Sequence, residues 1–332
     1  MAIVRTISQK DSMTLPFPVE EKYYHYSRYL HERFQTRVYR VSVDGGFTCP
    51  TRDGTKGFGG CLYCSNDSFA PKRTESLPSI TDQVKNGMAL IQRFHRAKKF
   101  LCYFQPYTNT YAPVEKLERL YREALSFPDV VGLCIGTRPD CVPEETLQLL
   151  ENLNNDSYIS IEFGIESIYD KTLQWVNRGH DFAQTCQAIH AAKAHGLHVS
   201  GHLILGFPTE TSEEMLAMAD VLNNLELDAL KIHHLHVVKN TPLAKIYAEQ
   251  PFRVFSESEW ISLVADFLER LRPDICIQRL CGEAKAGTLV APVWHLSKNE
   301  VIAGIRDELT RRGTWQGYLF NQNQPKNKSA KQ

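Results

Sequence analysis

Several features that would place the chain in a specialised class of protein are missing from its 332 residues. No run approaches the ~18 consecutive apolar residues of a membrane span. Residues 1–18 hold no apolar segment followed by a cleavage site, so we expect no signal peptide. The nine cysteines are odd in number and scattered, which is not the pattern of a secreted disulfide framework. These absences predict a protein of the reducing cytoplasm with no membrane partner.

An excess of charge of either sign is also missing. Lys and Arg together number 38, as do Asp and Glu, so the formal net charge is zero. The chain as a whole therefore has no net positive charge that would attract nucleic acid. The local basic stretches are residues 93–99, the set Arg28, Arg33, Arg37 and Arg40, and the tail lysines 326, 328 and 331. Because most such runs are solvated helix faces, they permit an RNA partner without arguing strongly for one.

A regular alternation of short strands with longer helices is what the sequence does contain. Helical patterns of apolar residues separate the strand segments, and repeated βα units of this kind indicate a parallel sheet. The six predicted strands are Val38–Val43, Phe100–Phe104, Val130–Ile135, Tyr158–Ile165, Leu197–Leu205 and Ala229–Val237. We therefore predict an α/β fold of the (β/α)6 partial TIM barrel type.

The chain divides into four predicted parts. Residues 1–37 form an N-terminal segment with a helix from Glu21 to Arg37, and residues 38–240 form the partial barrel. Residues 241–320 form a C-terminal α/β extension, which no Gly/Ser/Pro-rich linker separates from the barrel, so we expect it to pack there. The polar tail 321–332 is predicted to be disordered.

Three cysteines, Cys49, Cys61 and Cys64, lie within sixteen residues on the loop after the first predicted strand. Four glycines in the same loop let backbone N–H groups approach an anionic object closely. The two-residue gap between Cys61 and Cys64 lets both thiolates reach one metal centre, and Cys49 can return across the loop. A structural zinc site normally closes with four ligands, so three suggest a centre with one open coordination position. Thiolates suit both zinc and iron–sulfur centres, and only geometry divides these interpretations.

This loop resembles the cluster loop of the radical S-adenosylmethionine (SAM) superfamily. In that family three cysteines hold three irons of a 4Fe–4S cluster, and SAM chelates the fourth iron. The usual spacing is C-x3-C-x2-C, whereas the first gap here is eleven residues, as in a smaller group near the catalytic subunit of Elongator. Tyr63, the aromatic residue before the third cysteine, fits that group. The resemblance implies a radical SAM core and, as cofactors, a 4Fe–4S cluster bound by Cys49, Cys61 and Cys64, together with SAM.

The fourth predicted strand carries two carboxylates on one face. Side chains alternate along a strand, so apolar residues from Ile159 to Ile165 face the helices, while Ser160, Glu162, Gly164 and Glu166 face the barrel interior. A buried carboxylate is costly unless it is paired or liganded. The pattern therefore predicts a polar pocket, at the carboxyl ends of the strands where barrel enzymes do their chemistry.

Family resemblance suggests roles for residues around this pocket. The segment 161–167 and the Asn-Arg-Gly-His of residues 177–180 resemble the fourth-strand region of Elongator-like and coproporphyrinogen-oxidase-like enzymes. There a strand-four acid bonds the ribose of SAM and an arginine pairs with its carboxylate, which implies these roles for Glu162 and Arg178. Relatives often have Gln at the position of Glu166. We expect Glu166 either to contact SAM or to pair with a neighbouring cation. The remaining candidates at strand ends are Gln105 for the SAM amino group and Thr137 or Arg138 for SAM or substrate.

Histidines crowd the sixth predicted strand. His233, His234 and His236 lie beside Lys231, and we interpret them as substrate contacts rather than a second metal site, with no fixed role for any one of them. The six other cysteines fall mostly in apolar strands or helices, where cysteine acts as a small hydrophobe. We expect no auxiliary cluster.

Longer segments resemble a narrower bacterial group called YhcC-like. They are residues 107–113, 136–143, 177–182, 277–283 and 290–294. The resemblance implies cleavage of SAM to a 5′-deoxyadenosyl radical, electrons from a donor such as flavodoxin or ferredoxin, and action on the wobble uridine of tRNA, from carboxymethylaminomethyl towards aminomethyl. One alternative is a radical SAM enzyme acting on a small metabolite or a protein. A zinc-stabilised nucleic-acid-binding module is the other.

Overall fold

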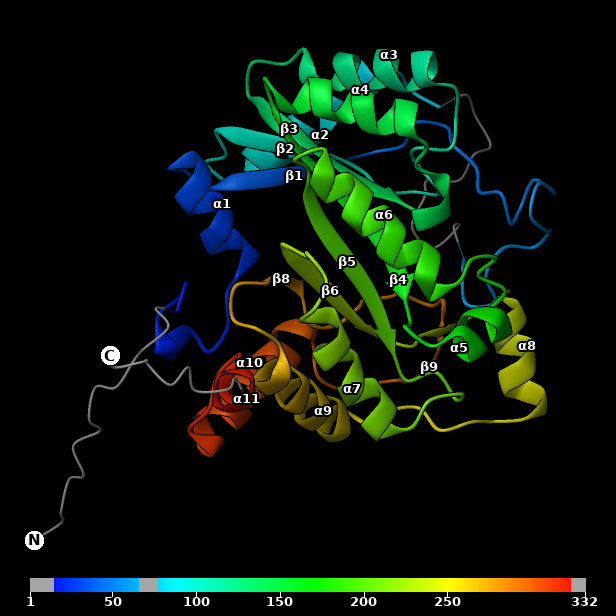
Figure 1. Cartoon of the computed structure of the whole chain (residues 1–332), viewed down its shortest axis with the longest axis vertical. Helices are drawn as coiled ribbons and strands as arrows, with labels where there is room; N and C mark the ends of the chain where they lie inside the picture. Colours follow the sequence, from blue (N-terminus) through cyan, green and yellow to red (C-terminus); the bar gives the residue numbers. More distant parts are fainter. Residues whose placement is uncertain (1–14, 66–76, 324–332) are drawn as a thin grey trace, which may run out of the picture.

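The alternating strands and helices fold into one curled, parallel sheet in the part of the chain that the computed structural model describes, residues 15–65 and 77–323 (Figure 1). In spatial order the strands are β1 (Val38–Val43), β2 (Lys99–Phe104), β3 (Val130–Thr137), β4 (Tyr158–Glu166), β5 (His198–Leu205), β6 (Ala229–His234) and β8 (Cys276–Arg279). Every neighbouring pair is parallel. The predicted partial barrel is confirmed, with a seventh strand contributed by the predicted C-terminal extension.

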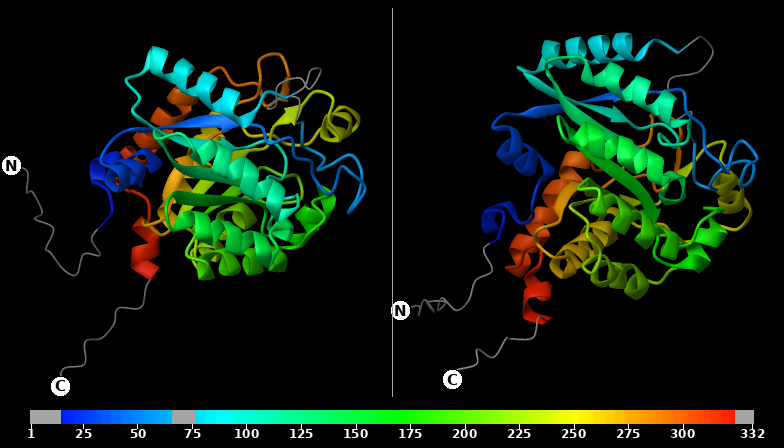
Figure 2. Two further views of the ribbon diagram at one scale, coloured as in Figure 1. Left: turned by 90° about the horizontal axis from the view of Figure 1, so that it is seen from above. Right: turned by 45° about the horizontal axis from the view of Figure 1, so that its top comes forward.

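Helices cover the outer face of this sheet (Figure 2). In α3, for example, Leu117, Leu120 and Tyr121 recur at helical spacing and are buried. The apolar face of β4 packs into the same core, as the parity of its residues predicts. The helices between strands of the sheet are α2 (Ile80–Phe94), α3 (Val114–Leu125), α4 (Glu144–Asn154), α5 (Asp170–Trp175), α6 (Phe182–Ala194), α7 (Ser212–Leu222), α8 (Pro242–Glu249) and α9 (Glu257–Arg270), with a 3-10 turn at Pro139–Cys141.

The N-terminal helix and the last part of the chain close the sheet on the β8 side. The 3-10 turn Val19–Glu21 and α1 (Tyr26–Phe34) precede β1, and α10 (Lys298–Arg312) and α11 (Tyr318–Asn323) follow β8. The Gln316 amide accepts from the backbone N–H of Tyr24 at 3.0 Å and donates to the carbonyl of Ile275 at 2.9 Å, which joins the two ends. Residues 321–323 of the predicted tail are helical, and the rest of the tail lies outside the described residues.

Two elements differ from the sequence prediction. The helix predicted from Glu21 spans only α1, because Gln35 adopts a left-handed conformation (φ 53°) and ends it. The predicted sixth strand divides, since β7 (Val237–Val238) leaves the sheet to pair antiparallel with β9 (Leu289–Ala291).

None of the helices in the described ranges combines the length and apolar character that a bilayer crossing needs.

Candidate active site

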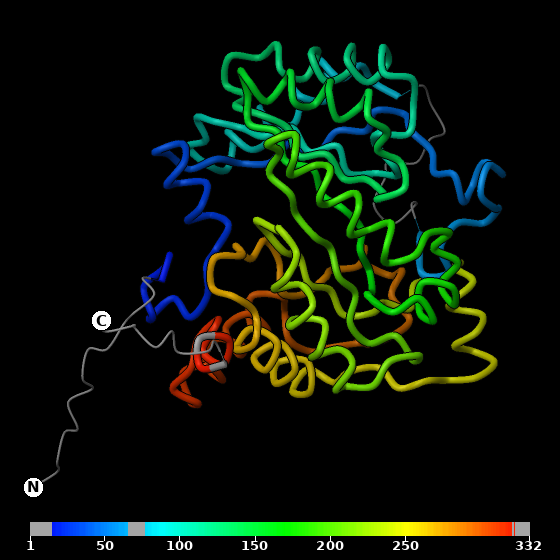
Figure 3. The backbone as a smooth tube through the Cα atoms, in the orientation of Figure 1, coloured from blue at the N-terminus to red at the C-terminus, as the bar shows by residue number. Residues whose placement is uncertain are grey.

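The loop after β1 is held at the carboxyl ends of the strands by two distant segments of the chain (Figure 3). The N–H of Leu62 donates to the carbonyl of Val176, and the carbonyl of Leu62 accepts from the N–H of Leu243, each at 3.0 Å. Gly60 turns the loop with φ 78°, and a Cβ at this position would lie 2.8 Å from an arginine side chain. Glycine is therefore required there, and the loop has a defined position relative to the sheet.

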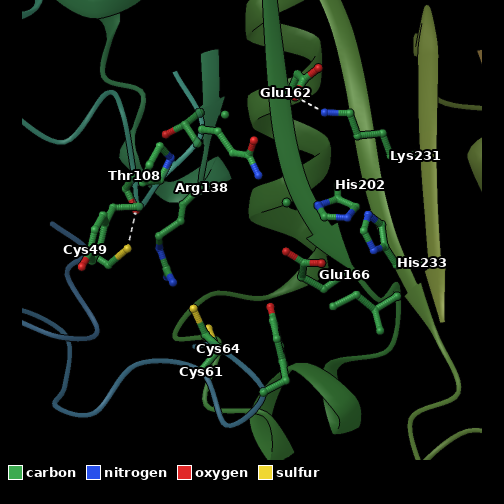
Figure 4. A pocket seen from close by; sticks show the side chains of 18 of the residues that line it. Cys49, Cys61, Cys64, Thr108, Arg138, Glu162, Glu166, His202, Lys231 and His233 are labelled. Atoms are coloured by element: carbon green, nitrogen blue, oxygen red, sulfur yellow. Dashed lines mark hydrogen bonds and ion pairs between the residues drawn. The ribbon is translucent and has the colours of Figure 1, made fainter. Parts of the chain in front are cut away.

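Cys49, Cys61 and Cys64 line one pocket at this end of the sheet (Figure 4). Cys61 is buried, and the other two are half-buried. The Cys49 thiol accepts from the Thr108 hydroxyl at 3.0 Å. Burial raises the pKa of Cys49, and it raises the pKa of Cys64 to about 11. Three soft thiols that share one cavity form a donor set that fits an iron–sulfur cluster. The described residues include no group of three or more His, Cys, Asp or Glu arranged to hold a single metal ion.

Glu162 lies inside the barrel, as its parity on β4 predicts, but its carboxylate already has a partner. Lys231 donates to one carboxylate oxygen, and Arg40 Nη1 lies 3.9 Å from the other. Burial alone would raise the pKa of Glu162, but these two cations outweigh it and hold that pKa at about 2. Burial lowers the pKa of Lys231 to about 8. The oxygen Oε1 has no hydrogen-bond partner, so it remains the group for the predicted ribose contact.

Arg178 and Glu166 meet where β4 ends. The guanidinium donates to the carbonyl of Gly164 at 2.7 Å, and it lies 3.6 Å from both Glu166 Oε1 and the Cys61 sulfur. Glu166 has φ 65°, and the pairing of β4 with β5 shifts register between Gly164 and Glu166, which redirects the carboxylate. Arg178 Nε and Glu166 Oε2 are buried without a hydrogen bond. This ion pair beside the Cys61 thiol thus keeps a donor and an acceptor for a bound group.

Gln105 and Thr137 also line the pocket, at the ends of β2 and β3. The Thr137 hydroxyl is 2.6 Å from that of Thr110. Arg138 lines the pocket as well, and its guanidinium binds the Asp140 carboxylate at 2.9 and 3.0 Å and donates to the carbonyl of Arg178 at 2.6 Å. Arg138 therefore supports the backbone at Arg178, and the predicted ligand contacts of Gln105, Thr137 and Arg138 stay predictions.

His202 and His233 lie across the pocket from Cys49 (Figure 4), and His234, His236 and Arg279 line the same pocket. Arg279 Nη1 donates to His233 Nε2 at 2.7 Å, and the Nε2 atoms of His234 and His236 are 2.7 Å apart. Burial lowers the pKa of His202 to about 3 and that of His236 to about 4. Burial also lowers the pKa values of His233 and His234 well below the usual range. All four imidazoles are therefore neutral at pH 7.

The sequence prediction misses several residues of the pocket, among them Tyr103, His202 and Arg279. His202 lies two residues beyond Ser200 on β5, so both side chains share one face of the strand. The alternation that identifies Glu162 on β4 would have found His202 as well, had it been applied to β5.

A family model for the Radical SAM superfamily matches residues 55–222, just over half of the chain. The chain belongs to the radical SAM superfamily. A second model, the Radical_SAM C-terminal domain, matches residues 227–311 of this radical SAM enzyme. The enzyme is 36% identical over 311 residues to the uncharacterized protein YtqA of Bacillus subtilis, covering 92% of this chain and 96% of YtqA. It is 37% identical over 266 residues to YhcC of Escherichia coli K12, covering 80% and 85%. The solved structure of Elp3 from Methanocaldococcus infernus, with an N-terminal deletion, shares the fold at a TM-score of 0.66 and 19% identity, covering 86% of this chain and 67% of that chain.

Membership of this family establishes the cofactors, a 4Fe–4S cluster and SAM. When bound, they supply a 5′-deoxyadenosyl radical that abstracts a hydrogen atom from the substrate. The pocket-facing Cys49, Cys61 and Cys64 are the thiols that would hold the cluster. The family match overturns the alternative of a zinc-stabilised nucleic-acid-binding module.

Proposed function

We propose that this radical SAM enzyme modifies the wobble uridine of tRNA, converting its carboxymethylaminomethyl side chain towards aminomethyl. The observation that carries the proposal is a similarity to an enzyme named for that nucleotide. The chain is 30% identical over 138 residues to the tRNA uridine(34) acetyltransferase of Methanocaldococcus infernus, covering 41% of this chain and 25% of that enzyme. The YhcC-like segments of the sequence support the same substrate.

The two walls of the pocket suit this reaction. One wall carries the cluster cysteines with Arg178 and Glu166, and we assign Glu162, Gln105 and Thr137 to contacts with SAM. The other wall carries neutral imidazoles, which accept and donate hydrogen bonds without adding charge. A uridine side chain with both an amine and a carboxylate would find polar partners there. Enclosure by the barrel keeps water and stray hydrogen donors away from the radical.

Two of the basic segments noted in the sequence lie away from this pocket, whereas Arg40 reaches Glu162 inside it and the tail lysines 326, 328 and 331 lie outside the described residues. Helix α1 carries Arg28 and Arg33, and residues 93–99 run from the end of α2 into β2; both segments lie at the end of the sheet away from the cysteine loop (Figure 1). Among the described residues, RNA contacts would therefore come from other cations near the pocket. We propose a cytoplasmic flavodoxin or ferredoxin as the electron donor, which would dock at the cysteine loop, where Phe58 is 80% exposed.

The test is an anaerobic reaction of the reconstituted enzyme with SAM, a reductant and tRNA whose wobble uridine carries the carboxymethylaminomethyl group. We expect aminomethyluridine in the nucleoside digest and 5′-deoxyadenosine formation that depends on this tRNA. Cys61→Ala is the control and should give neither product. If 5′-deoxyadenosine forms but the wobble nucleoside does not change, the tRNA proposal is wrong, and a small metabolite or a protein becomes the substrate class to test.

A further inference from the structure

Arg279 is one of two cations lining the pocket for which no carboxylate lies within 4.0 Å among residues 15–65 and 77–323, and the other, Arg52, donates to the backbone carbonyl of Cys64. The remaining lining cations are engaged as the pairs Arg138–Asp140, Arg178–Glu166 and Lys231–Glu162. A half-buried cation that lacks a counter-charge is unfavourable until an anion arrives. The imbalance therefore points to an anionic ligand at Arg279.

The neighbours of Arg279 orient its guanidinium without neutralising it. A guanidinium can only donate, so His233 Nε2 accepts the 2.7 Å hydrogen bond and the His233 proton lies on Nδ1. The His233 ring packs on backbone, since a Cβ at Gly282 would lie 2.4 Å from its Nδ1. The described structure shows no other hydrogen bond to Arg279, so its remaining N–H donors face no protein acceptor there.

We propose that Arg279 binds the carboxylate of the substrate, and that His233 is the positioning residue that holds the guanidinium. This inference rests on the proposed function, in which the carboxylate ends the carboxymethylaminomethyl side chain. The planar fork of arginine matches a carboxylate in two parallel hydrogen bonds. Arg279 lies at the end of β8, next to β6, and donates to His233, which lies across the pocket from Cys49 (Figure 4), while Arg178 lies beside Cys61. The two arginines are thus assigned to different carboxylates: Arg279 to that of the substrate and Arg178 to that of SAM.

This arrangement makes Arg279 a determinant of specificity. The substrate nucleoside carries a carboxylate and the aminomethyl product does not, so the product loses its contact with Arg279. The enzyme would then distinguish the modified uridine from its own product by one charge. A site built to hydrogen-bond a group rejects the analogue that lacks it, because its own polar atoms stay unpaired.

The test compares the binding of two tRNA anticodon stem-loops, one with carboxymethylaminomethyluridine and one with aminomethyluridine, to wild type and Arg279→Gln. Wild type should bind the carboxylate-bearing stem-loop roughly 10- to 100-fold more tightly, and Arg279→Gln should bind both equally. Arg279→Lys keeps the positive charge but lacks the planar guanidinium, so its preference for the carboxylate-bearing stem-loop should be intermediate. Arg253→Gln, which removes an exposed arginine before α9, is the matched control and should behave as wild type. SAM affinity should be unchanged in all of them, and thermal melts verify folding.

Three outcomes would overturn the assignment. An equal loss of affinity for both stem-loops in Arg279→Gln would mean that Arg279 contacts an RNA phosphate. A loss of SAM affinity with the preference intact would place the SAM carboxylate there. A preference that survives the substitution would show that the carboxylate binds elsewhere.

Failure of the tRNA proposal itself would appear differently, as a wild type that binds neither stem-loop and leaves the wobble nucleoside unchanged. Binding at the carboxylate site is then measured by ligand-observed NMR with N-methylglycine as the probe. This probe has the same N-substituted glycine group as the carboxymethylaminomethyl side chain. Saturation transfer to this probe with wild type but not with Arg279→Gln supports the site independently of tRNA. No transfer with wild type overturns it.

Discussion

The buried ion pair of Glu162 with Lys231 allows a quantitative test of how the barrel interior is stabilised. The side chains of Lys231 and Glu162 are 3% and 4% exposed. Replacing Glu162 by Gln leaves the ammonium group without its counter-charge in the middle of the barrel. Removal of one partner of a buried pair costs about 3–5 kcal/mol in the free energy of unfolding. The Gln side chain keeps one acceptor for Lys231, so we expect a loss near the lower end, about 3 kcal/mol.

The pH dependence of this loss follows from the pKa of Lys231. Burial already lowers it from 10.5 to about 8, and Glu162 opposes that effect, so the substitution should lower it further. A lysine whose pKa is lower in the folded state releases its proton on folding. Stability then rises with pH from the lowered value up to about 10.5. Wild type gains stability in the same way above its own Lys231 pKa of about 8, so the deficit of Glu162→Gln should shrink as the pH rises towards 8 and stay level above it.

The assay is urea denaturation of the metal-free proteins under reducing conditions, for wild type, both single variants and Glu162→Gln/Lys231→Met. The double variant should be destabilised by less than the sum of the single variants, with a coupling of at least about 2 kcal/mol. The exposed pair Lys171–Glu214 is the control, and Lys171→Met should cost less than about 1 kcal/mol. Additive effects, with a loss below about 1 kcal/mol for Glu162→Gln, would refute the reasoning.

Three further outcomes are expected. Cys61→Ala should reduce the iron content of the anaerobically reconstituted enzyme from about four atoms per chain to nearly none and abolish its visible absorption; retained iron would contradict the assignment of the loop. Gly164→Ala places a Cβ 2.5 Å from Arg178 Nη2 and Glu166 Oε1, so SAM affinity by equilibrium dialysis should fall roughly tenfold or more, and unchanged affinity would separate Arg178 from SAM. Burial raises the pKa of Glu210 from 4.5 to about 7. Its carboxyl group therefore takes up a proton on folding and stability falls as pH rises through that window, so Glu210→Gln should gain up to about 3 kcal/mol at pH 8 and progressively less towards pH 5 in urea denaturation.

The sequence predicts six of the seven strands of the sheet because they are segments of five or more residues, either apolar or alternating apolar with polar residues, with long helices between them. The elements that it misses are short. Strands β7 and β9 have two and three residues, too few to show a period. Helix α8 does carry a readable signal, since Thr241 caps it and Pro242 occupies its first turn.

The site is predictable only where its chemistry lies within one segment. The cysteine loop and the inward parity of β4 are local patterns, so both are visible in the sequence. The partners of Glu162 are not, because Arg40 and Lys231 come from β1 and β6, and only the curvature of the sheet brings them to one carboxylate. Arg279 is hidden for the same reason, since its significance depends on which acids are absent from its surroundings.

The two backbone hydrogen bonds of Leu62 have a consequence for the biogenesis of the enzyme. Their partners are Val176 and Leu243, far downstream in the chain, so the ribosome must synthesise about three quarters of the protein before the cysteine loop can acquire its final shape. During most of translation the three thiols are therefore carried by a loop without its supports. Delivery of iron and sulfide to a finished site is then a late event.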